Sequence, residues 1–207
     1  MGRRKLWIAA IGAIALAGLA FIARGTWKAI TLAQAYNGAA NISPQGGIDP
    51  EEYAVYSAVI ESDFINDAVE LVVVDRQTDL GYPSDNGPTA WDFKPSTEVW
   101  QDFLAKDKEH LSLMDNLDLS RPYLLVAEEE RSDVHARLSL AGVQSTPFLQ
   151  FSRVGLNPDR DEAVVHVTVA ILSRTRPAIE FAFGVLLYLR KVNGIWAIQV
   201  RQDTFIT

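Results

Sequence analysis

An apolar segment near the start of the chain constrains the architecture more than any other feature. Arg3, Arg4 and Lys5 precede 18 uncharged residues, 6–23. As a helix this segment would be about 27 Å long, close to the ~30 Å hydrocarbon core of a bilayer. Because basic residues stay in the cytoplasm, the sequence predicts a cytoplasmic tail over residues 1–5, a transmembrane anchor over 6–23 and an extracytoplasmic C-terminal part.

A cleaved signal peptide is the alternative, since it has the same order of a basic region and an apolar region. Two small-x-small sites could be cleaved. Ala15-Leu16-Ala17 lies inside the apolar segment, and Ala33-Gln34-Ala35 lies well beyond it. We therefore favour a retained single-pass anchor in the cell membrane, and cleavage would instead give a secreted or periplasmic protein.

The rest of the chain divides into a stem and one domain. Asn37-Gly38, Pro44 and Gly46-Gly47 interrupt regular structure, so residues 24–47 are predicted to be a linker. Residues 48–207 are long enough for one self-sufficient core. The chain has no cysteine, which excludes a lipid-attachment cysteine, a disulfide framework and a thiolate metal site.

The predicted domain is acidic. Residues 29–207 carry 14 basic and 26 acidic side chains, a net charge of −12, whereas the whole chain has −7. Such a surface repels the phosphates of nucleic acids and of anionic lipids. Nucleic acid is therefore not expected as a partner, and solubility is the simplest role of the charge.

The domain is predicted to begin with a helix over residues 50–66. Asp49 is typical of an N-cap, and Glu52 has the spacing that completes a capping box. Ile48 and Tyr53 have the spacing of a hydrophobic staple. Apolar residues at helical spacing indicate that this helix buries one face.

Further elements follow from composition and periodicity. A strand is predicted over 69–75, an irregular loop over 77–96, a second helix from residue 96 or 97, a strand over 123–127 and a short helix over 128–138. Residues 107–121 are ambiguous. Four strands are predicted in the last third of the chain, over 148–156, 162–172, 181–191 and 195–204.

Two patterns support the C-terminal strands. Between residues 163 and 172 the sequence alternates, with Ala163 and Val165 beginning one face and Val164 the other. Asn193-Gly194 is typical of a type I′ hairpin turn, and Trp196 is expected to share a buried face with Ile198 and Val200. Early helices followed by consecutive antiparallel strands predict an α+β domain with a C-terminal β-meander of about four to five strands.

The same C-terminal stretch carries a resemblance. Phe151-Ser152-Arg153-Val154-Gly155-Leu156-Asn157, Ala163-Val164-Val165-His166-Val167 and Gly194-Ile195-Trp196 resemble a pattern in uncharacterised bacterial secreted and membrane-anchored proteins. That group often has a Gly-rich segment where this chain has Ser173-Arg174-Thr175-Arg176-Pro177. The resemblance implies no known activity. The order of helix and meander is also similar to nuclear-transport-factor-like folds, which implies a cone-like curved sheet.

No pattern in the chain predicts catalytic residues, a cofactor or a metal. His166 is expected to be a half-buried, hydrogen-bonded strand histidine, with a pocket base as the alternative. His110 and His135 are expected at the surface. The oxygens of 157–161 have partial Ca²⁺-loop spacing but lack the later ligands, so a β-turn is predicted. Glu128-Glu129-Glu130 is predicted to start a helix.

These observations leave two classes of function. The favoured one is a membrane-tethered extracytoplasmic binding or interaction domain without catalytic activity, joined to the membrane through residues 6–23, whose protein or small-molecule ligand the sequence does not identify. The alternative is a small extracytoplasmic enzyme, for which a hydrolase is the simplest form. Convergent titratable groups with perturbed pKa values would favour the enzyme.

Overall fold

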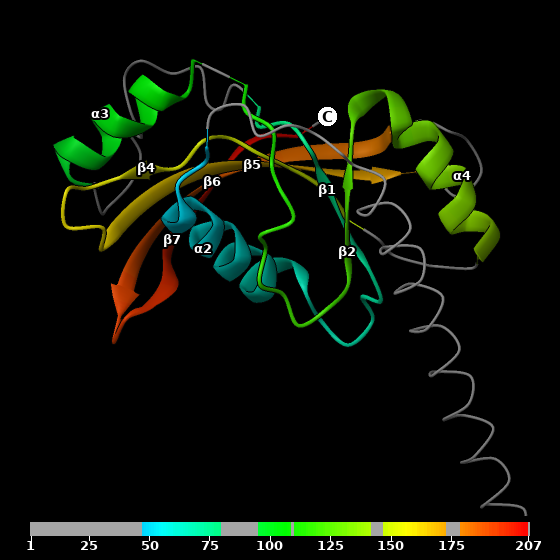
Figure 1. Cartoon of the computed structure of the whole chain (residues 1–207), viewed down its shortest axis with the longest axis horizontal. Coiled ribbons are helices and arrows are strands. Elements are labelled where there is room, and N and C mark those ends of the chain that lie inside the picture. The colour runs from blue at the N-terminus through cyan, green and yellow to red at the C-terminus, as the bar shows by residue number, and fades with distance from the viewer. Residues whose placement is uncertain (1–46, 80–94, 109, 142–146, 173–178, 207) are drawn as a thin grey trace, which may run out of the picture.

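The computed structural model describes residues 47–79, 95–108, 110–141, 147–172 and 179–206, which form a mixed α+β domain (Figure 1). The elements in chain order are α2 Pro50–Val59, the π-helical turn η1 Ile60–Phe64, β1 Val72–Asp75, α3 Thr97–Lys106, β2 Tyr123–Val126, the 3-10 turn η2 Glu128–Glu130, α4 Arg131–Ala141, β3 Phe148–Phe151, β4 Gly155–Leu156, β5 Glu162–Leu172, β6 Ile179–Val192 and β7 Ile195–Ile206.

The predicted transmembrane anchor, 6–23, and most of the predicted stem, 24–47, lie outside the described residues. Within the described part of the chain, no helix is long and apolar enough to cross a membrane. The predicted boundary at residue 48 is close to the first core residue, because Ile48 is buried in the main cluster.

The seven strands form one sheet in the order β2-β1-β3-β5-β6-β7, with β4 pairing with β5. The strands β5, β6 and β7 form the predicted antiparallel meander. In contrast, β1 runs parallel to both β2 and β3, an arrangement that the sequence did not predict. The α+β class is thus confirmed, with a short parallel part at one edge of the sheet.

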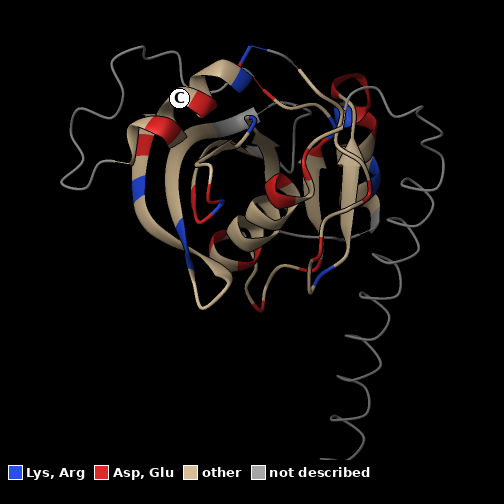
Figure 2. Cartoon of the chain, turned by 60° about the vertical axis from the view of Figure 1, so that its left-hand side comes forward, with Lys and Arg blue, Asp and Glu red and all other residues tan. Residues whose placement is uncertain are grey.

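The helices cover both faces of the sheet. The alternation in β5 separates these faces as predicted, because Val165 packs in the cluster beneath α2 while Val164 packs against α3. The residues of α4 pack on the α3 side, where Val134 and Leu138 share a cluster with Ala170 of β5. Figure 2 shows the long strands curving around α2, so the concave face of the sheet is filled by this helix.

Most predicted elements exist, with altered ends. The first helix was predicted to end at residue 66 but ends at Phe64, and its last turn is π-helical. The predicted helix over 128–138 begins with the 3-10 turn η2 and continues to Ala141. The strand predicted over 148–156 is divided into β3 and β4 by an interruption at residues 152–154.

The final hairpin confirms the predicted turn but places one residue of β7 on the face opposite to the one predicted. Asn193 and Gly194 have φ of 55° and 81°, as a type I′ turn requires. Trp196 is buried in the α2 cluster, and Ile198 packs against it. The expectation for Val200 was wrong: the register shifts between the pairs Tyr188–Val200 and Leu189–Ile198, so β7 has one extra residue and Val200 packs on the α3 side.

Candidate functional site

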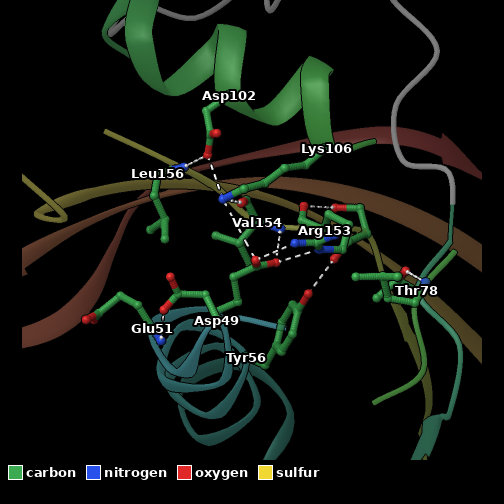
Figure 3. Close-up of polar contacts among 12 residues, drawn as sticks. Asp49, Glu51, Tyr56, Thr78, Asp102, Lys106, Arg153, Val154 and Leu156 are labelled. Atoms are coloured by element: carbon green, nitrogen blue, oxygen red, sulfur yellow. Dashed lines mark hydrogen bonds and ion pairs between the residues drawn. The ribbon is translucent and has the colours of Figure 1, made fainter. Parts of the chain in front are cut away.

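A buried carboxylate at the start of α2 is the centre of the most extensive polar network that the structure describes (Figure 3). Glu52 has no exposed surface. Arg153 donates to both of its oxygens, from Nε at 2.9 Å and from Nη2 at 2.8 Å, and the backbone N–H of Val154 donates at 3.0 Å. This bidentate geometry with an additional backbone donor compensates the cost of burying the carboxylate.

The local structure of α2 explains why Glu52 points inward. Asp49 caps the helix by accepting a hydrogen bond from the N–H of Glu51. Glu52 does not complete the predicted capping box, since its carboxylate bonds to Arg153 and Val154 instead. The predicted staple residues, Ile48 and Tyr53, belong to the same core cluster, so the entry of the chain into α2 is buried as expected.

A β-bulge between β3 and β4 brings Arg153 to Glu52. Phe151 pairs with Val167 and Gly155 pairs with Val164, so three residues on this strand lie opposite two on β5. Such an extra residue bends a strand and redirects its side chains. One sequence feature is consistent with the bulge: Arg153 is the single charged residue in the predicted strand 148–156.

Ser152 satisfies the backbone groups that the bulge disturbs. Its Oγ accepts from the N–H of His166 at 2.9 Å and donates to the carbonyl of Arg153 at 2.9 Å. The carbonyl of Ser152 accepts from the hydroxyl of Tyr56 at 2.9 Å. Burial and the nearby Glu52 carboxylate raise the pKa of Tyr56 well above its usual value, so this hydroxyl remains a donor at neutral pH.

Helix α3 completes the network. Lys106 Nζ lies 2.7 Å from Asp102 Oδ2 and 3.8 Å from Glu52 Oε1, and it donates to the carbonyl of Val154 at 3.1 Å. Asp102 also accepts from the N–H of Leu156 at 2.8 Å. Two acidic and two basic side chains therefore join α2, α3 and the bulge with no net charge.

Gly155 allows this close approach of α3. A Cβ at this position would lie 2.5 Å from the Cβ of Phe103 and 2.6 Å from the carbonyl oxygen of Val99. Contacts this short would require the α3 backbone to move. The absence of a side chain at Gly155 therefore lets α3 lie close enough for Lys106 to contact the bulge.

His166 lies on the opposite face of the sheet, where it is 4% exposed. Its Nε2 is 3.0 Å from Oγ1 of Thr204, and its ring lies 6.3 Å from that of Phe205. Burial lowers the pKa of His166 to about 4, so the ring is neutral at pH 7. The prediction of a hydrogen-bonded strand histidine is confirmed, but the residue is buried rather than half-buried as expected.

The other candidate residues do not join His166. His110 is exposed and its Nδ1 lies 2.6 Å from the carbonyl oxygen of Thr78, whereas His135 is half-buried on α4. The Glu130 carboxylate accepts from the N–H of Ala127, the N-cap of η2, at 3.1 Å, so this acidic side chain caps its own turn. Among the described residues, no group of three His, Asp or Glu side chains could hold a metal ion.

The loop at 157–161 is a turn, as predicted. Asn157 Oδ1 accepts from the N–H groups of Asp161 and Glu162, at 2.9 and 3.0 Å, and its Nδ2 donates to Asp161 Oδ1 at 2.6 Å. The carbonyl of Asn157 accepts from the N–H of Arg160, which has a φ of 55°. Its side-chain oxygen is thus used within the turn itself.

A second buried ion pair lies at the carboxyl end of β1. Asp75 is 1% exposed, contacts Nη2 of Arg131 and accepts from the N–H of Gln77 at 3.0 Å. The guanidinium of Arg131 also lies 4.8 Å from the ring centroid of Phe148. This pair attaches the start of α4 to the parallel part of the sheet.

Comparison with protein-family models, with curated proteins and with solved structures found no match for this chain. The resemblance of the C-terminal strands to uncharacterised bacterial proteins therefore stays a prediction. Sequence reasoning missed the Glu52–Arg153 pair, because the two partners are 101 positions apart.

Proposed function

We propose that this protein is a membrane-tethered extracytoplasmic domain that binds a partner and does not catalyse a reaction. The observation that carries the choice of binding over catalysis is the saturation of Glu52. Both of its oxygens accept from Arg153, and one also accepts from Val154. Lys106 Nζ lies 3.8 Å from Oε1 and the carboxylate has no exposed surface, so a substrate has no access to it and its role is to position α2 against the bulge.

The tether rests on the sequence. Arg3, Arg4 and Lys5 before the 18 uncharged residues 6–23 support a single-pass anchor with the domain outside the cytoplasm. Fractionation of cells that express the full chain tests this part. The intact polypeptide should sediment with membranes and resist extraction by carbonate, whereas a shortened form in the soluble fraction would show cleavage.

The alternative, a small extracytoplasmic enzyme, is favoured by one contact. A neutral His166 lies 3.0 Å from the hydroxyl of Thr204, which is the relation of a base to a nucleophile in acyl-transfer enzymes. A fluorophosphonate probe distinguishes the two functions. The binding proposal expects no labelling above that of Thr204→Val, and labelling that is lost in both Thr204→Val and His166→Gln would establish the enzyme.

A further inference from the structure

The tip of the β6–β7 hairpin exposes two aliphatic side chains. Ile195 is 72% exposed and Val192 is 52% exposed, and they form the pair that closes the type I′ turn. Figure 1 shows this hairpin extending past the rest of the sheet. Each of these two adjacent apolar side chains therefore leaves more than half of its surface exposed to solvent.

This tip lies at the end of the domain where the chain enters from the stem. Glu51, in the first turn of α2, contacts Lys191 Nζ at 2.7 Å and accepts from Trp196 Nε1 at 2.7 Å. The start of α2 and the base of the hairpin are therefore fixed to each other. Residues 24–47 could span about 80 Å when fully extended, which is long enough for this end of the domain to reach the bilayer that holds the anchor.

The charges behind the tip are paired. Lys191 is bonded to Glu51, and Arg190 Nη2 lies 3.5 Å from Glu162 Oε1. Paired charges next to an apolar tip suit a zwitterionic lipid surface, where the tip enters the headgroup region and the ion pairs remain in water. An anionic surface would be opposed by the net charge of −12 of residues 29–207.

From this arrangement we propose that the Val192–Ile195 tip inserts into the zwitterionic surface of the membrane that anchors the chain. The proposal rests on the proposed function, because it requires the tether. Two aliphatic side chains bind lipid weakly in solution, but tethering raises the effective concentration of the partner surface to about the millimolar range. The contact would orient the domain relative to the bilayer and would hold its opposite end away from the lipid.

The absence of cysteine from the chain allows a direct test with the full-length protein. Val192→Cys, labelled with an environment-sensitive fluorophore, is reconstituted in phosphatidylcholine vesicles with or without doxyl-labelled lipid. The matched control is the same label at Leu140→Cys, which is 89% exposed on α4. Doxyl lipid should reduce the emission at position 192 by roughly twofold, as expected for a group in the headgroup region, and leave position 140 unchanged.

A second substitution ties the signal to the tip. Ile195→Asp in the Val192→Cys protein should abolish the quenching, and the fold should persist because the side chain is exposed. Equal quenching at 192 and 140, no quenching at either, or a blue shift at 192 without quenching would overturn the proposal, the last by indicating a protein contact. Failure of the full chain to remain with vesicles would overturn the tether itself, which is a different result.

Discussion

Arg153 donates from two nitrogens to the two carboxylate oxygens of Glu52, at 2.9 and 2.8 Å, across 101 positions of sequence. The contact joins the first helix of the domain to the bulge that divides β3 from β4. Both side chains are buried, so neither charge is screened by water. The pair is therefore expected to fix how the elements meet, and its removal should have different effects depending on whether one or both charges are removed.

Glu52→Gln should destabilise the domain by about 3–5 kcal/mol, because it leaves the Arg153 charge buried without its partner. The double change Glu52→Leu/Arg153→Met should cost less than Glu52→Leu or Arg153→Met alone, since it removes both charges. Urea unfolding of these three variants and of Glu52→Gln measures the differences. Equal or additive losses would show that the two residues are not coupled.

A matched exposed pair provides the control for that experiment. Asp133 and Arg137 contact each other at 2.8 Å on α4, with side chains that are 59% and 58% exposed. Asp133→Asn should change the free energy of unfolding by no more than about 0.5 kcal/mol, as is typical of solvated i,i+4 pairs.

Gly155→Ala should destabilise the domain by about 1–3 kcal/mol, because the added Cβ forces α3 away from β4. The nearest atoms, at 2.5 and 2.6 Å, are a Cβ and backbone atoms of α3, which cannot rotate aside. Gly47→Ala is the control, since a Cβ there would meet nothing within 4 Å. Thermal unfolding measures both variants. A parental midpoint for Gly155→Ala would contradict the close approach of α3.

Acidification should destabilise the domain through His166. Burial lowers its pKa from the ordinary value of 6.5 to about 4, so between these values the unfolded chain binds a proton that the folded domain does not. The contribution is fully present above pH 6.5 and is lost as the pH falls towards 4, by about 3 kcal/mol in total. Between pH 7.5 and 5.0, urea unfolding should show a smaller loss in the free energy of unfolding for His166→Gln than for the parent. Equal losses would show that His166 is not the group responsible for the pH dependence.

Trp196→Ala should cost about 3–5 kcal/mol, because the ring is buried in the cluster beneath α2. The substitution also removes the hydrogen bond from Nε1 to Glu51 and the ring beneath Lys191, whose Nζ lies 5.0 Å from the centroid. Replacing Asn193-Gly194 by Ala-Ala should be milder, since it strains only two residues with positive φ. If thermal unfolding reversed this order, the hairpin would be packed differently.

Local patterns predicted the C-terminal sheet well. The alternation from Ala163 onward gave the two faces of β5, and Asn193-Gly194 gave the turn, because each depends on neighbouring residues alone. The bulge in β7 that moves Val200 to the other face depends on pairing with β6, and nothing in the sequence of β7 marks it. The parallel pairing of β1 with β2 and β3 is likewise set by long-range contacts.

The polar network shows the same limit. Glu52 has the spacing of a capping-box residue, so local reasoning assigned it to the helix end. Its actual partner, Arg153, lies in the β3–β4 bulge. Predicting this bulge requires the pairing register with β5. The burial of Arg153 calls for an acidic partner, but the sequence shows neither that burial nor which of the 26 acidic residues the partner is.

The most direct test of the central claim, a membrane-tethered extracytoplasmic domain, is labelling of one introduced cysteine in intact bacterial cells. Leu140→Cys places a sole thiol at an 89% exposed position of the full-length chain. A membrane-impermeant maleimide should label the protein before lysis, and the labelled polypeptide should sediment with membranes at its full mass. Labelling only after lysis, or a full-length protein in the soluble fraction, would contradict the account.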